Sequence, residues 1–426
     1  MSERDPGDPG DPAPGAGGRL PLTAGTPVED AVEVVEAWVE AAVPAAWRAA
    51  AGAGVALREV RTFAEYEAWY PVFAASGLVV PTWPVAYGGL DLPPTTARAI
   101  ERVLAPYGLG RLNPLGLNLC APALFAHGTE EQRLRYLPRI VDNIERWCQL
   151  FSEPGAGSDL ASLATRAERD GDGWVLTGQK VWTTWAHVSE WGVCLARTDP
   201  AVPKRAGITY FLVDLHAEGV DVRPLRHITG EVDFNEVFLD GVRVPDAQRV
   251  GAEGAGWKVA GATLSGERQM VSGAGSGGVD RIGGSGADAL VASARRTRGW
   301  SDPVVRQRVV RLWSEEQVRG WTNARVRAGL KAGRSPGPES SIGKVHQGDL
   351  NQRLQLAACD LLGPAALAWE GDALPREVKG MLRSRANTIE GGTTEVNKNV
   401  VGERVLGLPR EPDPWSGAPW TEVPRS

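Results

Sequence analysis

Hydrophobic residues recur at helical spacing in the first third of the chain. From residue 28, valines follow one another at steps of three or four residues, beside glutamates: Val28, Val32, Val35, Val39 and Val43. This spacing places the valines on one face of an amphipathic helix. Further helical patterns cover residues 63–73, 95–105 and 130–144, with breaks at proline and glycine. We therefore predict an all-helical N-terminal domain over residues 28–148.

The pattern changes near Gln149, where short runs rich in β-branched and aromatic residues begin. Such runs occupy residues 173–177, 207–213 and 235–239, and turns rich in Asp, Gly and Pro separate them. This is the pattern of strands joined by tight turns. We predict a central β domain over residues 149–253.

Helical patterning returns after residue 254 and shows no internal repeat. We predict a C-terminal helical domain over residues 254–410, followed by a tail over 411–426. The first 27 residues are rich in proline and glycine and poor in apolar side chains, so we expect a disordered tail there. Helices, then strands, then helices predict an α+β fold with segregated layers.

Composition and charge exclude several classes of function. The net charge of -6 over 426 residues argues against nucleic acid as a partner, because there is no basic cluster to neutralise phosphates. The sequence contains no run of about 18 apolar residues, so it does not predict an ordinary membrane-spanning helix. The first 27 residues lack the pattern of an export or transit peptide. The four cysteines show no paired spacing, so we expect neither zinc nor disulfides and a reducing, cytoplasmic location.

A loop of small residues lies where the helical pattern gives way to strands. It reads Phe151-Ser152-Glu153-Pro154-Gly155-Ala156-Gly157-Ser158-Asp159. Because Gly157 and its neighbours carry little side chain, the backbone N–H groups of such a loop can approach a flat polar ring or a phosphate closely. For Gly-Ala-Gly-Ser alone, a plain surface turn is the better interpretation.

The longer string Ser-Glu-Pro-Gly-Ala-Gly-Ser-Asp strongly resembles the flavin-contacting motif of the acyl-CoA dehydrogenase family. Residues 178–184, Gly-Gln-Lys-Val-Trp-Thr-Thr, resemble the strand in which the family packs a Trp on the flavin and bonds its reactive nitrogen with a Thr. Residues 392–396 and 402–410 are similar to the family's C-terminal stretch. With weaker matches, the resemblance covers about residues 30 to 410. It implies an N-terminal helical domain, a central β domain and a C-terminal helical bundle.

The resemblance also implies FAD as cofactor and assigns residues to it. The expected FAD contacts are Phe151, Ser152, Gly157, Ser158, Trp182, Thr184, Arg296, Thr393 and Glu395. Ser158 and Arg268 are expected to contact the acyl-CoA substrate. Near Arg296 the chain reads Arg-Thr-Arg-Gly and lacks the Phe that many relatives carry.

The family's reaction needs a base for the α proton of an acyl thioester, and the chain offers two carboxylates. Removing this proton requires a carboxylate whose pKa burial raises. In the motif of many relatives the base directly precedes Gly-Thr, but here that place belongs to Gly391, and Glu390 stands one position earlier. A second subgroup of the family takes the base from an earlier helix and keeps the C-terminal position small. Glu267 with Gly391 resembles that pattern, so we favour Glu267 and keep Glu390 as the alternative. The backbone N–H of Gly391 is then the expected donor to the thioester oxygen.

The resemblance leaves two other functions open and implies partners. One alternative is a non-catalytic or heteromeric partner subunit, and the other is a flavin oxidase or monooxygenase on the same fold. The implied partners are an electron-transfer flavoprotein as acceptor and further subunits in a homodimer, a homotetramer or a heteromer. Residues 273–278 fit G-x-G-x-x-G, but a helical pattern precedes them, so we do not expect a nicotinamide site.

Overall fold

A computed structural model of the protein describes residues 18–424 apart from 56, 272–285, 298, 332–336, 370 and 372. The side chains of residues 58, 265–271, 330 and 331 also lie outside the described part. The G-x-G-x-x-G stretch falls within the first of the longer gaps. Contacts divide the chain into two units: unit 1 comprises Met1–Leu117 and Gly128–Trp147, and unit 2 comprises Asn118–His127 and Cys148–Ser426.

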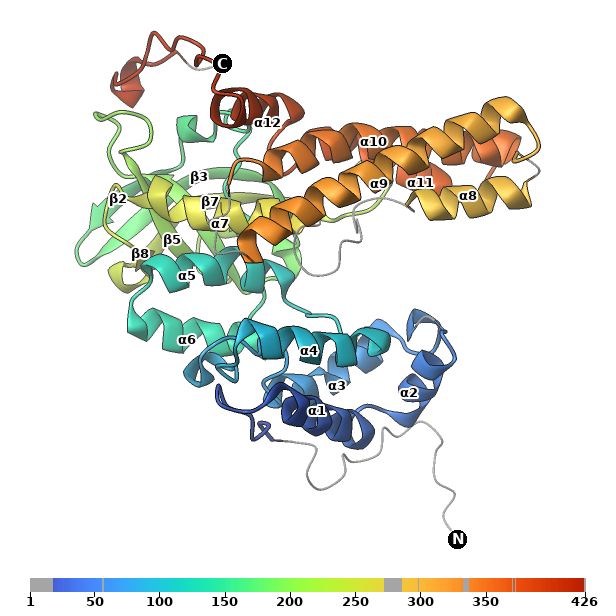
Figure 1. The fold of residues 1–426 in the computed structure, drawn as a ribbon. Coiled ribbons are helices and arrows are strands. Elements are labelled where there is room, and N and C mark those ends of the chain that lie inside the picture. Colours follow the sequence, from blue (N-terminus) through green and yellow to red (C-terminus); the bar gives the residue numbers. More distant parts are fainter. Residues whose placement is uncertain are drawn as a thin grey trace. The chain divides into compact units, whose positions relative to one another are not determined.

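Unit 1 is helical, as the periodicity predicts (Figure 1). Its α-helices are α1 (Val28–Ala42), α2 (Ala45–Gly52), α3 (Phe63–Ala75), α4 (Pro94–Leu104) and α6 (Glu130–Val141). Short 3₁₀ turns cover Leu57–Glu59, Val85–Tyr87 and Ala105–Tyr107. Two capping boxes start helices: Thr62 with Glu65 begins α3, and Thr129 with Gln132 begins α6.

Aromatic rings from three helices form much of the core of unit 1. Trp69 of α3 lies 5.3 Å from Trp47 and 6.2 Å from Trp38, centroid to centroid. The guanidinium of Arg61 lies 3.9 Å from the centroid of the Tyr66 ring. Such tilted and edge-on ring contacts stabilise the packing of α1, α2 and α3 beyond the area that they bury.

Unit 2 is built on one β-sheet. Its strands are β1 (Trp147–Leu150), β2 (Arg166–Asp170), β3 (Gly173–Thr184), β4 (Trp191–Arg197), β5 (Ile208–Asp214), β6 (Val220–Leu225), β7 (Phe234–Pro245) and β8 (Arg249–Val250). The strand order is β6-β7-β3-β2-β4-β5-β8, with β1 paired to β4. The neighbours β2 and β4 run parallel, whereas β3 and β7 pair antiparallel along most of their length.

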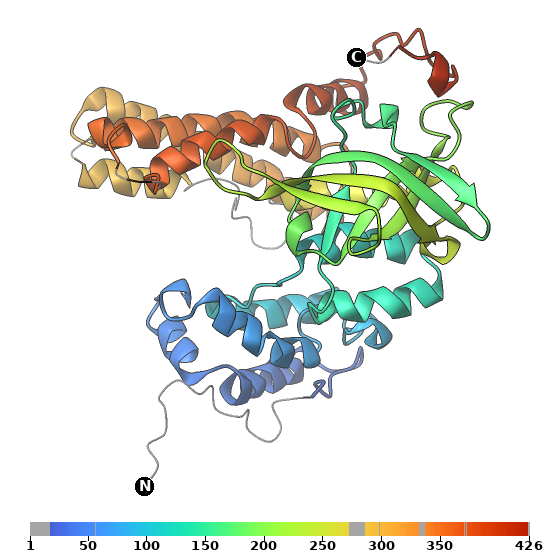
Figure 2. The same cartoon turned by 180° about the vertical axis from the view of Figure 1, so that it is seen from behind.

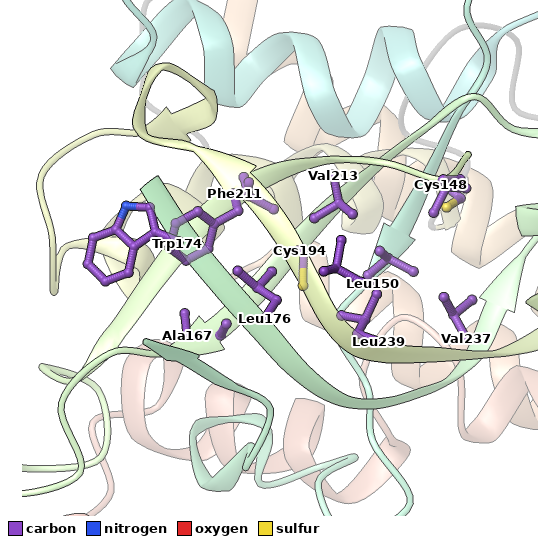
Figure 3. Close-up of a cluster of buried hydrophobic side chains, with 14 of the residues drawn as sticks. Cys148, Leu150, Ala167, Trp174, Leu176, Cys194, Phe211, Val213, Val237 and Leu239 are labelled. Carbon is purple, nitrogen blue, oxygen red and sulfur yellow. The ribbon is translucent and has the colours of Figure 1, made fainter. Parts of the chain in front are cut away.

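The core of the sheet consists of side chains that alternate inward along the strands (Figure 3). Trp174 and Phe211 lie edge to face, with centroids 5.4 Å apart. Cys194 and Leu150 fill the centre and are fully buried. This alternation explains why the strand segments could be recognised in the sequence.

The C-terminal helices of unit 2 gather around α10 (Figures 1 and 2). The helices of unit 2 are α5 (Ala121–His127), α7 (Gly256–Val271), α8 (Ala287–Arg296), α9 (Pro303–Lys331), α10 (Ser340–Leu362), α11 (Arg376–Ser384) and α12 (Thr394–Val400). α7 packs on β5 and α5, while α8, α9, α11 and α12 pack on α10. Leu290, Val309, Leu312, Leu350 and Leu354 form the core of this bundle.

The expected fold class, with an N-terminal helical part, a central sheet and a C-terminal helical part, is confirmed. Among the described residues, no helix combines the length and the apolar character needed to cross a membrane.

Candidate active site

A buried ion pair fixes the small-residue loop to the sheet. Lys180 of β3 is fully buried, and its Nζ lies 2.8 Å from Glu153 Oε1 in the loop. The same Nζ donates to the carbonyls of Leu195 on β4, at 2.7 Å, and of Phe151, at 3.3 Å. The carboxylate of Glu153 also accepts the backbone N–H groups of Ala164 and Thr165, at 2.7 and 2.9 Å. One charged pair thus joins the loop, two strands and the segment that leads into β2.

The environment of Glu153 keeps its carboxylate charged. Burial raises the pKa of Glu153, but the charge and hydrogen bond of Lys180 and the further hydrogen bonds outweigh burial, so the pKa lies below its usual value. The surrounding donors also explain how an ionic pair is tolerated where water is excluded.

The loop presents its backbone to solvent beyond this anchor. Gly157 and Ser158 are exposed, and a Cβ added at Gly157 would meet no atom within 4 Å. Ser152 accepts the N–H of Val181 at its carbonyl, at 2.9 Å, so the loop runs beside the end of β3. The structure therefore brings the loop motif and the β3 motif together, as the resemblance implies.

A β-bulge near the end of β3 exposes an indole. Lys180 pairs with Val237 and Thr183 pairs with Asn235. Between these two pairs β3 therefore contains one more residue than β7. Trp182 lies in this bulge with φ 61°, in the left-handed region that a bulky residue rarely adopts, and 57% of it is exposed. Its ring lies 5.8 Å from the ring of Phe234 and edge-on to it. A bulky residue held in the left-handed region is strained, and strained residues cluster at functional sites.

Buried polar groups hold the bulge from behind. Asn235 is fully buried, and its Nδ2 donates to the carbonyl of Thr183 at 3.0 Å. Its Oδ1 lies 3.0 Å from His187 Nδ1. Thr184 follows on β3, half-buried, and pairs with Phe234 on β7. Trp182 and Thr184 thus lie two residues apart at the end of one strand, which buried polar groups hold in place.

The C-terminal motif forms a turn between α11 and α12. Gly391 and Gly392 are consecutive left-handed residues, with φ 63° and 85°, and Thr393 caps α12 by accepting the N–H of Val396. Within the described part of the chain, no oxygen accepts the N–H of Gly391. Glu395 lies exposed in the first turn of α12.

Glu390 is held by its own segment. Arg383 Nη2 donates to Glu390 Oε2 at 3.0 Å, and Asn387 Nδ2 donates to Oε1 at 2.9 Å. The guanidinium of Arg383 also lies 5.8 Å from the centroid of Phe234, the ring that Trp182 contacts. Through Arg383 and Phe234, the C-terminal turn lies next to the Trp182 bulge.

One imidazole and two carboxylates lie close together beside this bulge. Ligand atoms of His227, Glu231 and Asp233 lie within 4.8 Å of one another. His227 Nε2 bonds Asp233 at 3.1 Å and its Nδ1 bonds Thr229, while Glu231 pairs with Lys379 of α11. These partners account for the cluster without an ion.

A cleft of about 230 Å³ lies between the loop and β3. Its lining includes Pro154, Gly155, Thr165 and Gly178, but not Ser158, Trp182 or Thr184. The expected flavin contacts therefore do not belong to this cleft.

Comparison with known proteins identifies the fold's family. Models of the N-terminal, middle and C-terminal domains of acyl-CoA dehydrogenases match residues 53–143, 148–242 and 254–406. The chain is 39% identical over 393 residues to acyl-CoA dehydrogenase IpdE1 of Mycobacterium tuberculosis, covering 90% of this chain and 98% of that protein. The chain belongs to the acyl-CoA dehydrogenase family.

Chains from two solved structures are similar to this acyl-CoA dehydrogenase over about nine-tenths of its length. The Tcur3481-Tcur3483 steroid ACAD shares 26% identity at a TM-score of 0.70, covering 92% of this chain and 100% of that one. The ChsE4-ChsE5 complex from Mycobacterium tuberculosis shares 28% identity at a TM-score of 0.66, covering 91% and 99%.

Acyl-CoA dehydrogenases are flavoproteins, with FAD as the usual cofactor. The residues present fit such a group, because the space beside Gly157 is open and the ring of Trp182 is exposed next to Thr184.

Sequence reasoning missed Lys180 and Glu153 as the supports of this arrangement. The signal that could have revealed them is the alternation along β3, which places Lys180 on the same face as the buried Trp174 and Leu176, because a buried lysine is rarely tolerated without a partner.

The remaining expected residues lie elsewhere in unit 2. Arg296 is exposed at the end of α8, and no hydrogen bond or ion pair among the described side chains joins it to the small-residue loop. Glu267 and Arg268 belong to α7, but their side chains lie outside the described part. Thr263, one helical turn before Glu267, is fully buried, and its hydroxyl lies 3.0 Å from that of Tyr210 on β5.

Replacing Lys180 by Met should destabilise unit 2. The variant leaves the buried carboxylate of Glu153 without its cation, so we expect the free energy of unfolding to fall by about 3 kcal/mol at neutral pH. Urea unfolding followed by tryptophan fluorescence measures it. Lys204→Met is the matched control, because Lys204 and Asp159 form a pair on the surface, where an ion pair contributes less than about 1 kcal/mol. Equal losses in the two variants would contradict the assigned role of Lys180.

The difference between wild type and Lys180→Met should shrink in acid. Glu153 has a lowered pKa in the folded state, so its contribution is present above the unfolded-state value of about 4.3 and is lost as pH falls through the folded-state value. Without Lys180, only the hydrogen bonds from Ala164 and Thr165 oppose the effect of burial, so the pKa of Glu153 should rise. Repeating the urea titrations from pH 7 to about pH 3 checks the trend, because the wild type loses this contribution only below about pH 4.3.

Proposed function

We propose that this protein catalyses the FAD-dependent α,β-dehydrogenation of an acyl-CoA thioester to the 2-enoyl-CoA. The observation that carries the proposal is the exposed indole of Trp182, strained at the end of β3, where the neighbouring Val181 donates its N–H to Ser152 of the small-residue loop. This is the combination that a flat ring with a polar edge requires. Membership of the acyl-CoA dehydrogenase family supports the same reaction.

Residues on the loop, on β3 and on the C-terminal turn would hold FAD. Ser152, Gly157 and Ser158 would supply loop donors, while Trp182 would cover the ring face and Thr184 would reach its edge. The other proposed contacts are Phe151, Arg296, Thr393 and Glu395. When bound, FAD supplies the acceptor for the hydride that leaves the β carbon.

Glu267 is our proposed base for the α proton. A base needs a carboxylate oxygen that is free to take a proton, and both oxygens of Glu390 already accept hydrogen bonds, from Arg383 and Asn387. Gly391 would donate its N–H to the thioester oxygen, where negative charge develops as the proton leaves. Its left-handed φ of 63° favours glycine at this position, which also leaves no side chain beside the reacting carbon.

The proposed substrate class is a CoA thioester attached to a steroid or a similar fused-ring skeleton. This choice rests on the similarity to the Tcur3481-Tcur3483 steroid ACAD, which extends over 92% of the chain. Ser158 and Arg268 are the proposed contacts to the CoA part.

The active form is proposed to be an oligomer that passes its electrons to an electron-transfer flavoprotein. Apolar side chains stand exposed along α9, which is typical of an interface: Val304, Val310, Trp313, Val318 and Trp321. The similarity to the two-component ChsE4-ChsE5 complex favours a heteromer. This similarity also supports a second candidate function, in which the chain is the non-catalytic subunit of a heteromeric enzyme.

Exchanging each carboxylate for its amide separates the two candidate bases. For Glu267→Gln we expect kcat to fall by at least about a hundredfold, because the amide cannot accept the α proton. Glu390→Gln should keep kcat within about threefold, because an amide oxygen still accepts the bond from Arg383. Anaerobic bleaching of the bound flavin by the acyl-CoA measures both variants.

Retained flavin absorbance in both variants is the control that binding is intact. Rapid bleaching by Glu267→Gln with slow bleaching by Glu390→Gln would reverse the assignment. Wild-type protein that binds flavin but is bleached only after a second subunit is added would favour the partner-subunit function. Bleached flavin that reoxidises rapidly in air would instead indicate an oxidase.

A series of CoA thioesters tests the substrate class. We expect kcat/KM for a thioester on the side chain of a steroid to exceed that for straight-chain octanoyl-CoA by about tenfold or more. A straight chain makes fewer apolar contacts in a pocket shaped for fused rings, so it binds the transition state more weakly. Steady-state rates with an artificial electron acceptor give both values. Preference for the straight chain would exclude a steroid pocket.

A further inference from the structure

The segment Pro419–Val423, beyond the residues that the family models match, is docked on the loop between β4 and β5 in unit 2. Pro419 forms a bridge with Pro203, and the N–H groups of Trp420 and Thr421 donate to the carbonyls of Val202 and Pro200, at 2.9 and 3.2 Å. Trp420 is 8% exposed and Val423 is 7% exposed. A tail held by backbone pairing and by two buried apolar side chains is part of the folded structure.

Trp420 covers a buried cation. The guanidinium carbon of Arg197 lies 4.4 Å from the centroid of the indole, and Arg197 is 3% exposed. The indole Nε1 donates to the carbonyl of Ser162 at 3.3 Å. The ring therefore shields a charge that would otherwise face water, and it contacts the loop beside that charge.

Arg197 in turn holds two loops together. Its Nε and Nη2 donate to the carbonyls of Leu163 and Ala161, at 3.0 and 2.7 Å, in the segment that follows Ser158. Its Nη1 donates to the carbonyl of Lys204, at 3.0 Å, in the turn between β4 and β5. A planar fork of donors suits this task, because it fixes several carbonyls in one geometry.

The same two loops meet again at an ion pair next to Ser158. Lys204 Nζ lies 2.6 Å from Asp159 Oδ2, which also accepts the hydroxyl of Ser162 at 2.5 Å. Burial raises the pKa of Asp159, but the bonds and charges of its partners outweigh burial and lower the pKa. Arg197 and Asp159 are thus two connections between the same loops, and Trp420 covers the first of them.

We infer that Pro419–Val423 is a clasp that positions the Ser158 loop for the CoA part of the substrate, with Trp420 as its positioning residue. The inference rests on the proposed function, in which Ser158 contacts the acyl-CoA. Trp420 itself touches no reacting group. Its removal should therefore weaken substrate binding and leave the chemical step intact.

Steady-state kinetics of Trp420→Ala and Trp420→Leu test the clasp in the full-length protein. With the acyl-CoA that the wild type turns over best, we expect KM to rise by about tenfold and kcat to stay within about twofold. Trp420→Leu keeps much of the apolar volume but removes both the ring face and the indole N–H. It therefore tests the clasp if Trp420→Ala does not fold. Trp415→Ala is the matched control, because Trp415 lies in the same tail and is 44% exposed. A KM equal to that of the wild type in a folded Trp420 variant would overturn the proposal.

Hydrogen exchange provides a readout that does not depend on turnover. In the Trp420 variants, amides of residues 160–165 and 198–207 should exchange at least about threefold faster, while those of β3 stay unchanged. Unchanged exchange in both loops would overturn the clasp. If the wild type turns over no acyl-CoA, the proposed function fails, whereas faster exchange would still establish that Trp420 holds the loops.

Discussion

The contact between Lys180 and Glu153 is the interaction on which the site depends. It joins the small-residue loop to β3 and β4, and Glu153 extends it to the start of β2 through two backbone N–H groups. Loops with exposed glycines have little packing of their own, so their positions are set where they are anchored. A buried charge that is satisfied on all sides makes a rigid anchor, because each displacement would leave a charge or an N–H without a partner.

This rigidity allows the strain at Trp182. A left-handed φ in a bulky residue costs about 1–3 kcal/mol, which the surroundings must offset. Lys180, two residues earlier, is fixed by its ion pair, and Thr183, one residue later, is fixed by Asn235. The strained residue therefore lies between two anchored neighbours. The result is an apolar ring that is exposed and held in one place, as the proposed contact with the flavin requires.

The sequence predicts the fold and part of the site, and the reasons differ from element to element. α1 could be predicted from the valine spacing, because burial of one helix face produces a periodic pattern. β5 could be predicted from its continuous apolar run, because both of its faces are buried. The loop and Trp182 could be named through the family's motifs. The exposure and φ of Trp182 could not be predicted, because the bulge depends on the register between β3 and β7, which lies far away in the sequence. Trp420 was missed for a similar reason, since a tail with few apolar residues gives no period and its contacts lie far away in the sequence.

The two carboxylates show how partners decide a residue's chemistry. Glu390 looks like a catalytic residue displaced by one position, yet Arg383 and Asn387 occupy both of its oxygens. Arg383 also lies over Phe234, which contacts Trp182, so the pair connects the C-terminal turn to the bulge. An ion pair that connects two parts of a site loses its function when it is protonated, whereas a base must take up a proton in every turnover. Glu390 therefore has a structural role in its ion pair with Arg383, and the next residue, Gly391, has an N–H with no acceptor among the described residues. Both features agree with the proposal that Glu267 is the base.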